Sequence, residues 1–534
     1  MFKQFKTPLF LLVILSLFSC IKEDDLYLKN LEFTGWTADI GVPILSTNVD
    51  IHDLLDISNS ADFYIDNSGN IFILSKSSVF YKNGASCFIV PAQLDSGETL
   101  LSATNIQTLS QTGSYSAIIN HNFPFSLGSG QRLDSMFLKR GNLEVSIFNS
   151  LPRQGTLNIL IPAATKNGVS FNKTISFNQS NGTTSSYTFS LSDLNGYKLN
   201  FTSTSNPSSI QILYGITYTN TGTGTPLPGT GLNFSANFDS LEYSFAAGYF
   251  GDNQFPIPVD SAQIDLLNDN PNDTFSLTNP TLKIEFQNSI GMPVRLTNIL
   301  IQPITNSGQP ITLTINPPFP NPTIISGASY VGQVVSDSLV VNSQNSNIAT
   351  AYSQHPGYII YGADAGTNTG NPSVGNFITD SSYFSANLIT KTPIEGWSKR
   401  FTVTDTSDFD LNDAENIDTA IFRVEAFNGF PLNAYTQIYF MDSNYIALDS
   451  LLLHPEDLII ESATVNSSGV AVTPTHHIHD EVVVNSRLMR ISEATKVMIV
   501  SRLTTNNAPQ NSIKVLESNT LDIKIGVRAR VNIK

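Results

Sequence analysis

Apolar and polar residues alternate one by one in many short runs of this chain, and this alternation restricts its fold more than any other feature. Residues 143–147, 282–286 and 521–527 are clear examples. Successive side chains of a β-strand point to opposite faces, so such runs form sheets with one buried and one wet face. Clusters of Gly, Asn, Ser and Pro end the runs, as turns do between strands. The sequence therefore predicts an all-β chain.

Helical patterns are scarce and short. Residues 51–57 and 408–417 are each long enough for a turn or two, and residues 488–494 form the best short helix. Numerous short strands separated by turn residues are typical of β-sandwiches. We expect several tandem β-sandwich-like modules with few short helices.

Three segments repeat the same order of a strand, an asparagine, a small turn, a proline and a second strand. The asparagines are Asn149, Asn288 and Asn428, which lie 139 and 140 residues apart. Asparagine tolerates left-handed turns, and proline begins a strand only where no ladder donor is needed. The even spacing favours an internal repeat, although turns of this kind can also recur by chance in an Asn-rich β chain.

Acidic, Asn-rich stretches at residues 268–279 and 405–417 suggest where the modules separate. We expect an N-terminal β region over residues 26–133. Three β modules of similar size follow it in the prediction, over residues 134–270, 271–405 and 406–534.

The first residues have the pattern of an export signal. Two lysines lie within residues 1–6, and an almost unbroken apolar run follows over residues 8–18. The run is too short to span a bilayer and is typical of a secretory signal peptide. It ends in Leu17-Phe18-Ser19-Cys20, which resembles a bacterial lipobox, although Phe18 is larger than the usual residue. The resemblance implies that residues 1–19 are removed and that Cys20 carries palmitate-type acyl chains, enough for stable anchoring.

The residues after Cys20 resemble a second signal. Lys22 is followed by Glu23, Asp24 and Asp25, as in the export signal of surface lipoproteins of Bacteroidota. The resemblance implies a lipid-anchored protein of the outer membrane that faces the cell exterior, with residues 20–25 serving as anchor and export signal. A charged linker is the alternative, and the resemblance says nothing of the body of the chain.

Charge and cysteine content limit the partners. The chain has 44 acidic and 28 basic residues, a net charge of −16, and only 13% charged residues. Nucleic acid is thereby excluded as a partner, because its phosphates need clustered Lys and Arg. With Cys20 lipidated, Cys87 has no cysteine to pair with, and we expect it to be a buried small apolar residue.

The segment from His476 to Glu481 is the strongest metal-binding candidate. If it forms a strand, His477 and His479 share one face and could bind a transition metal together with a carboxylate. If it forms a loop, which Pro474 favours, it is a solvated polar turn.

A calcium site is the second metal-binding candidate. Asp408, Asp410 and Asn412 alternate like the opening of a calcium loop. Asp413 replaces the glycine such a loop needs, however, and Thr419 replaces its closing glutamate. A solvated linker is the default interpretation, so we expect no cofactor, with Ca²⁺ as the alternative.

One short pattern recurs along the chain: aspartate, then serine or threonine, then an aliphatic residue or methionine. It resembles the O-glycosylation sequon of exported Bacteroidota proteins, in which the hydroxyl residue is the acceptor. The structural alternative is that Asp-Ser pairs form side-chain turns where strands begin. The candidate acceptors are Ser135, Ser240, Ser261, Ser338, Thr419 and Ser450.

Motifs of the common catalytic and phosphate-binding folds are missing from the sequence. It has no G-x-S-x-G elbow, no H-E-x-x-H, no C-x-x-C and no P-loop. Paired carboxylates that meet only in space stay open. We expect a noncatalytic cell-envelope lipoprotein whose β modules bind a glycan or a protein. The alternatives are an envelope protein that binds a lipid or another hydrophobe, and a surface hydrolase.

Overall fold

The computed structural model describes residues 36–533 except 52–62, 129, 182–183, 202–207, 265–273, 369–374, 410–416, 455–458 and 507. Cys20 and the predicted export signal from Lys22 to Asp25 lie outside the described residues, as do Asp410, Asn412 and most of the predicted helices at 51–57 and 408–417. Antiparallel strands make up most of the rest, which confirms the all-β prediction. The chain divides into two compact units. Unit 1 comprises Met1–Asp56, Ser398–Ile513 and Ser518–Lys534, and unit 2 comprises Ile57–Trp397 and Lys514–Glu517.

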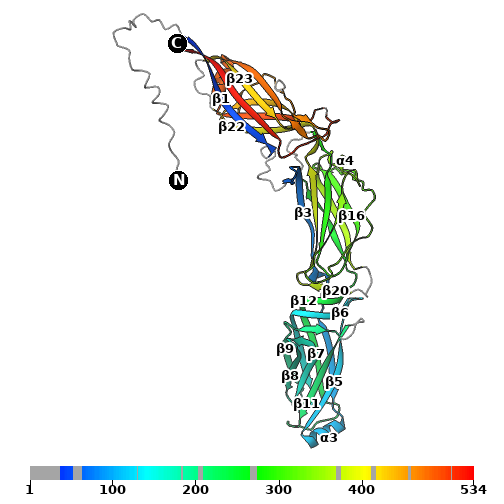
Figure 1. Ribbon diagram of the computed structural model, residues 1–534. Coiled ribbons are helices and arrows are strands. Elements are labelled where there is room, and N and C mark those ends of the chain that lie inside the picture. The colour runs from blue at the N-terminus through cyan, green and yellow to red at the C-terminus, as the bar shows by residue number, and fades with distance from the viewer. Residues whose placement is uncertain are drawn as a thin grey trace, which may run out of the picture. The chain divides into compact units, whose positions relative to one another are not determined.

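Unit 2 contains two β-sandwiches, and Figure 1 labels several strands of each. We call the one built from β4 to β12 the inner sandwich, because the chain enters and leaves it in mid-sequence. One of its sheets has the order β9 (Ser186–Asp193), β6 (Arg132–Asn149), β12 (Gly231–Tyr249), β4 (Gln93–Leu100). The other has the order β8 (Val169–Phe177), β7 (Gly155–Lys166), β11 (Ser208–Thr219), β5 (Ser114–Phe125). The short β10 (Lys198–Asn200) pairs with both β6 and β7.

The middle sandwich is formed by segments on both sides of the inner one. Its first sheet has the order β18 (Val335–Val341), β15 (Thr281–Asn288), β21 (Tyr383–Pro393), β3 (Ile71–Asn83), β2 (Phe63–Ile65). Its second sheet has the order β13 (Gln254–Gln263), β19 (Pro356–Thr367), β16 (Val294–Thr305), β17 (Thr323–Ile325). It also contains η3 (Gly84–Cys87) and α4 (Ile348–Tyr352), and β20 (Asn376–Thr379) pairs with β12 of the inner sandwich.

Unit 1 forms the outer sandwich, so named because it uses the first and last described strands. Its first sheet has the order β29 (Thr475–Val484), β23 (Ile417–Asn428), β32 (Thr520–Ile533), β1 (Trp36–Asp50). Its second sheet has the order β22 (Glu395–Asp408), β30 (Lys496–Thr504), β24 (Asn433–Met441), with β25 (Ala447–Ser450) and β26 (Ile459–Ile460) both paired to β24. Two short strands pair with β22, namely β14 (Thr274–Leu277) and β31 (Ile513–Lys514). Unit 1 also contains the hairpin of β27 (Thr464–Val465) and β28 (Ala471–Thr473) and the helix α5 (Asn485–Ser492).

The three sandwiches share one topology and are nested in the chain. The short strands β2, β10, β14, β20, β27, β28 and β31 are left out of this comparison, and β25 and β26, which both pair with β24, share one position. Each sandwich then has eight strand positions along the chain, with one sheet in the order 6-3-8-1 and the other in the order 2-7-4-5. This is the order of a jelly roll, a double-sheet all-β architecture. In the outer sandwich the connection from strand 1 to strand 2, β1 to β22, contains the other two sandwiches. In the middle sandwich the connection from β3 to β13 contains the inner one.

The described strands of residues 26–133 therefore do not form a region of their own. They supply the first strand of each sandwich, β1, β3 and β4, together with the short β2 of the middle sandwich and the second strand of the inner one, β5. The reason is long-range pairing: β1 joins β32 in register from Trp36 opposite Ile533 to Asp50 opposite Thr520. Alternation along a sequence identifies a strand but not its partner.

The three repeated asparagines are structurally equivalent. Asn149, Asn288 and Asn428 end the third strand of their sandwiches, and their exposed fractions are 0, 0 and 1%. In each case Oδ1 accepts a hydrogen bond of 2.9–3.1 Å from the backbone N–H two residues later. Each Nδ2 donates to two or three backbone carbonyls, one of them 29–38 residues further along the chain. The amide thus satisfies backbone groups that the turn would leave unpaired and buried.

The cores follow from the alternation of apolar residues. Along β11 every second residue is buried, and Ile210, Ile212 and Ile216 are all 0% exposed. Cys87 is buried and free, as expected, and its burial raises the pKa of the thiol. The helix expected at 488–494 is present as α5.

Helix α3 (Ala103–Thr112) has no apolar stripe that would predict it. It depends on its caps instead. The hydroxyl of Ser102 accepts from the Asn105 N–H at 3.2 Å, and Gly113 ends the helix at a φ of +79°. A left-handed C-cap of this kind favours glycine.

Candidate functional site

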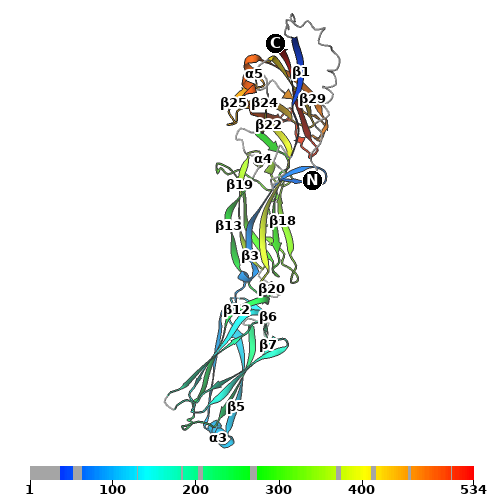
Figure 2. The ribbon, with the colours of Figure 1, turned by 90° about the vertical axis from the view of Figure 1, so that its left-hand side faces the viewer.

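Four connections of the inner sandwich gather at one end, the end that carries α3 in Figures 1 and 2. They are residues 101–113, 150–154, 178–185 and 220–230. Antiparallel strands reverse direction at every turn, so alternate connections of a sandwich lie at the same end. We call this the loop end. The chain enters and leaves the inner sandwich at the opposite end, since β4 begins there and β12 finishes there.

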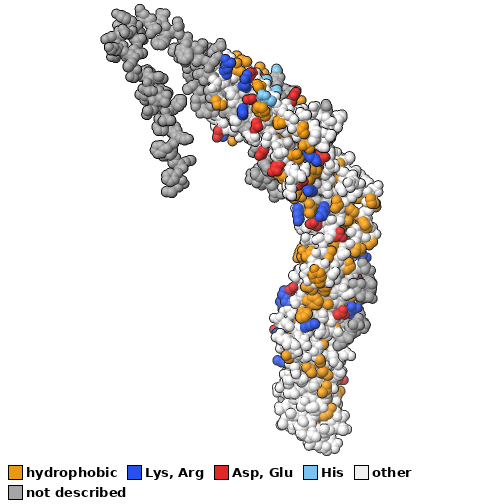
Figure 3. Space-filling view, in the orientation of Figure 1, with side chains coloured by type: hydrophobic (Ala, Val, Ile, Leu, Met, Phe, Trp, Pro, Cys, Tyr) orange, Lys and Arg blue, Asp and Glu red, His pale blue; other side chains and the backbone are white. Residues whose placement is uncertain are grey.

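The loop end is polar but almost uncharged. Of the 37 residues in its four connections, 22 are Ser, Thr, Asn or Gln, and Arg153 is the only charged one. In Figure 3 the surface around this end is drawn almost entirely in white, the colour of side chains that are neither charged nor hydrophobic. A chain with 13% charged residues would place about five in a segment of this size. The loop end is therefore depleted in charge even for this protein.

Arg153 is engaged within the loop end. Its Nε donates to Asn220 Oδ1 at 3.0 Å, and its Nη1 donates to the carbonyl oxygens of Pro152 at 2.6 Å and Gly224 at 2.9 Å. These bonds direct the guanidinium to the protein's own backbone and position the 220–230 connection. Arg153 therefore has a structural role, since it links the 150–154 connection to the 220–230 connection.

Hydrogen bonds join the four connections to one another. Ser180 N donates to Leu151 O at 3.1 Å, which links 178–185 to 150–154. Thr223 N donates to Gln179 Oε1 at 3.2 Å, and Asn220 N donates to Gly113 O at 2.9 Å. Gly222 permits this packing, because a Cβ there would lie 2.4 Å from Gln179 Oε1. The loops therefore hold each other in place.

A shallow hollow of about 550 Å³ opens at the loop end. Its lining consists of uncharged polar residues and Gly222. Its polar residues include Gln154, Gln179, Asn181, Thr184, Ser186 and Thr221. Sequence reasoning did not single out these residues, because they come from three connections that only the fold brings together. In the sequence, the site could have been found only from the composition of these connections, which are rich in uncharged polar residues and poor in charge.

Residues His476 to Glu481 lie on β29, so they form a strand and not a loop. His477, His479 and Glu481 are half-buried on one side of the strand, as expected for a strand, and His476 is on the exposed side. The ring of His476 stacks on Phe427 at 4.3 Å, and its Nε2 lies 2.9 Å from Glu425 Oε1. The side chain of His476 is therefore engaged by Phe427 and Glu425.

The Nε2 atoms of His477 and His479 are buried, and neither makes a hydrogen bond to a described residue. His479 Nε2 lies 3.5 Å from Glu481 Oε2. Burial holds the pKa of His477 below its usual value, and the neighbouring His479 lowers it further. Within the described part of the chain, no group of three or more His, Cys, Asp or Glu is placed to hold a metal ion.

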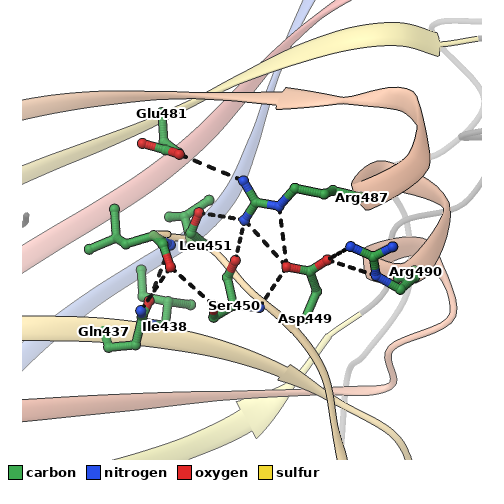
Figure 4. Close-up of polar contacts among 9 residues, drawn as sticks. Gln437, Ile438, Asp449, Ser450, Leu451, Glu481, Arg487 and Arg490 are labelled. Atoms are coloured by element: carbon green, nitrogen blue, oxygen red, sulfur yellow. Dashed lines mark hydrogen bonds and ion pairs between the residues drawn. The ribbon is translucent and has the colours of Figure 1, made fainter. Parts of the chain in front are cut away.

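Next to Glu481, helix α5 is fastened to β25 by an ionic network (Figure 4). Asp449 lies 3.3 Å from Arg487 and 2.7 Å from Arg490. Arg487 also donates to the backbone carbonyl oxygens of Ser450 and Leu451, the latter at 2.8 Å, and its Nη1 lies 3.7 Å from Glu481. The side chains of Asp449 and Arg487 are only 8% and 12% exposed. Every charge here has a partner within the network, which makes it a structural clamp.

Asp408, the described member of the calcium candidate, ends β22 and pairs with Lys496. This contact holds the pKa of the Asp408 carboxyl below its usual range. Its side chain is 89% exposed. Asp410 and Asn412 lie outside the described residues, so the calcium site stays a prediction.

The six candidate glycosylation acceptors all lie in strands. Ser240 and Ser261 are exposed, and Ser135, Ser338, Thr419 and Ser450 are partly buried. In three of the pairs the aspartate Oδ1 accepts from the N–H of the following serine at 2.7–2.8 Å. Ser450 also donates its hydroxyl to Leu452 O at 3.0 Å. The Asp-Ser pairs thus have a local structural role, and glycosylation stays a prediction.

Two apolar cavities among the described residues are small and lie within the sandwiches. One of about 40 Å³ is bounded by Phe430, Ile499 and Leu521 in the outer sandwich. Another of about 30 Å³ is bounded by Phe286 and Tyr361 in the middle sandwich. No helix among the described residues is long and apolar enough to cross a membrane.

Among the described residues, four carboxyl groups have pKa values held below their usual range by hydrogen bonds or ion pairs. Asn70 has this effect on Asp66, Lys283 on Glu285, Lys496 on Asp408 and Arg423 on Asp480. These groups are ionised near neutral pH. A general acid for glycoside hydrolysis needs the opposite shift.

The fold and the loop end define an all-β protein of three nested jelly-roll sandwiches with one polar, almost uncharged end. No protein-family model matches the sequence, and no curated protein matches it at a significant level. Among solved structures, a protein from Parabacteroides distasonis described as secreted is matched at 9% identity and a TM-score of 0.17, over 66% of this chain and 99% of the other.

Two viral structures are also matched. A triple jelly-roll protein of an archaeal virus has 10% identity and a TM-score of 0.10, over 85% of this chain and 96% of the other. An infectious bursal disease virus particle protein has 9% identity and a TM-score of 0.14, over 91% and 83%. TM-scores this low carry no argument about function for any of the three.

Proposed function

We propose that this chain is a noncatalytic lipoprotein of the outer membrane, displayed on the cell exterior, that binds a ligand through the loop end of its inner sandwich. The observation that carries the proposal is the gathering of four polar connections, which hold a single charged residue among them, at one end of the sandwich. Binding residues are often found on loops that a rigid scaffold positions. The anchor part of the proposal rests on the N-terminal sequence, where Cys20 and the residues from Lys22 to Asp25 resemble a lipobox and an export signal.

The dimensions of the cavities found among the described residues favour this function over hydrophobe binding. Ligand pockets usually have volumes of roughly 300–1,000 Å³. The apolar cavities of about 40 and 30 Å³ are far smaller, whereas the polar hollow reaches about 550 Å³.

Cell fractionation tests the anchor. Cys20→Ala removes the acylated thiol, so the variant should leave the outer-membrane fraction, whereas Cys87→Ala should remain in it. Retention of Cys20→Ala in the outer membrane would show that the anchor is assigned wrongly.

Protease treatment of intact cells tests the display. Changing Lys22 to Asp25 to alanine should protect the chain from added protease while it remains lipidated. If that variant is cleaved on intact cells as readily as the unchanged protein, these residues do not direct export.

A further inference from the structure

We propose that the hollow at the loop end, together with three exposed aromatic side chains of the same sandwich, binds a neutral oligosaccharide. This inference rests on the proposed function, because it names the ligand class of the end that we infer to be the recognition surface. Two features of the same sandwich carry it: the chemistry of the lining, and a row of exposed rings on the outer face of β6 and β9, the strand that Ser186 of the lining opens.

The lining matches a neutral ligand rich in hydroxyl groups. Amide side chains such as Gln154 and Asn181 offer both donors and acceptors, and the hydroxyls of Thr184 and Thr221 do the same. Sugar hydroxyls need this mixture. No lining residue is charged, so a phosphate or carboxylate ligand would lose its hydration without gaining a counter-charge.

The aromatic row lies on the outer face of β6 and β9, whereas Ser186 faces the other way, since successive side chains of a strand point to opposite faces. Ser186 lines the hollow, and Tyr187 follows it in β9. Tyr187 and Phe189 are 66% and 56% exposed, and Phe148, directly opposite Tyr187 on β6, is 45% exposed. All three therefore lie on the outer face of the same two strands. Exposed apolar groups gathered in this way on a soluble surface indicate a binding site.

Tyr187 extends along the sheet. Its hydroxyl lies 3.0 Å from the hydroxyl of Ser146, whose partner in β9 is Phe189. The ring is thereby held beside the strand and keeps its large exposed area. A flat ring next to donors and acceptors suits a sugar, whose C–H face is apolar and whose edge carries hydroxyls.

The charge of the loop end favours a glycan over a protein partner. Protein interfaces are enriched in arginine and have polar, solvated rims. The only arginine of the four connections, Arg153, is tied to Asn220, Pro152 and Gly224. The hydrogen bonds between connections also fix the hollow before binding, which lowers the ordering cost that a weak sugar ligand must overcome.

Titration calorimetry with defined sugars tests the proposal. The mature chain carrying Cys20→Ser is titrated with neutral hexasaccharides of glucose, mannose, xylose and N-acetylglucosamine, and with hexagalacturonate as the acidic counterpart. We expect at least one neutral hexasaccharide to bind more tightly than hexagalacturonate. Tyr187→Ala should weaken that binding about tenfold and Gln154→Ala at least about threefold.

Two variants serve as controls. Ile118→Ala removes a side chain that is 76% exposed on β5, in the opposite sheet of the same sandwich, and should change affinity less than about twofold. Tyr187→Phe keeps the ring and should retain most of the binding. If Tyr187→Ala lowers the melting temperature, Gln154→Ala and Tyr187→Phe decide the question instead.

The proposal is overturned if no neutral hexasaccharide binds, if hexagalacturonate binds best, or if Tyr187→Ala and Gln154→Ala bind as the unchanged chain does. Crosslinking of a protein to the loop end in place of a sugar overturns it too. In these cases the proposed function can still stand, because surface display is measured separately by fractionation and protease treatment of cells.

Discussion

At the residue scale, the buried asparagines show how one side chain can fix a turn. Asn149 satisfies four backbone groups: the N–H and carbonyl of Leu151 and the carbonyls of Arg153 and Asn178. The pattern of asparagine, small turn and proline was visible in the sequence. The long-range bond to Asn178 was not, because it depends on how the next hairpin folds back.

Asn149→Ala should destabilise the inner sandwich by roughly 2–4 kcal/mol, because it leaves several buried backbone groups unpaired. Urea unfolding followed by far-ultraviolet circular dichroism measures the change. Asn122→Ala, on the exposed side of β5, is the matched control and should cost less than about 0.5 kcal/mol. Equal effects of the two substitutions would contradict the role assigned to Asn149.

His477 should make the stability of the outer sandwich fall as the pH is lowered. Its pKa is lowered in the folded state, chiefly by burial, so below the ordinary histidine pKa of about 6.5 the unfolded chain binds more protons. The stabilisation is present above that pH and is lost as the pH falls through the folded-state pKa.

Melting temperatures measured from neutral to mildly acidic pH check this expectation. His477→Gln should flatten the dependence, whereas His454→Gln, at an exposed position, should leave it unchanged. If the melting temperature of His477→Gln still falls with pH as in the unchanged chain, another titratable group causes the fall.

At the element scale, the clamp between β25 and α5 illustrates what alternation cannot reveal. The Asp-Ser-Leu pattern at residue 449 suggested a glycan acceptor, and α5 was expected from its own apolar spacing. Only the fold places Asp449 between Arg487 and Arg490 (Figure 4). Strands such as β11 were predictable because every second residue is buried. Their partners were not, since register depends on both strands.

Asp449→Asn should destabilise the outer sandwich by roughly 2–4 kcal/mol, because Arg487 would keep a nearly buried charge with a weaker set of partners. Asp380→Asn breaks a pair with Lys139 whose side chains are 36% and 60% exposed, and should cost less than about 1 kcal/mol. Unfolding in urea compares the two variants. If they unfold at the same denaturant concentration, the clamp is not a source of stability.

At the scale of the whole molecule, the nesting of three sandwiches explains why sequential boundaries were a poor guide to the modules. The class of fold, the absence of long helices and the repeat of the third strand were all readable in the sequence. The first strands were not assignable, because β1 and its partner β32 lie at opposite ends of the described chain. The loop end was equally hidden, since its residues come from four separate connections.

The nesting predicts an unequal response to N-terminal truncation. Deleting residues 21–50 removes β1 and leaves one side of β32 unpaired, which exposes a long strand edge. Limited proteolysis should then degrade the outer sandwich while a fragment close to residues 57–397 resists. Deleting only residues 21–35 is the control and should leave both units resistant. Loss of both units, or of neither, in the longer deletion would argue against this topology.

The central claim is that the loop end of the inner sandwich is the recognition surface on the cell exterior. A photo-crosslinking amino acid in place of Gln154 on living cells tests it most directly, with the same group in place of Ile118 as the control. The account predicts a covalent adduct at residue 154, identified as glycan by mass spectrometry, and none at residue 118. No adduct at 154, or equal adducts at both positions, would contradict it.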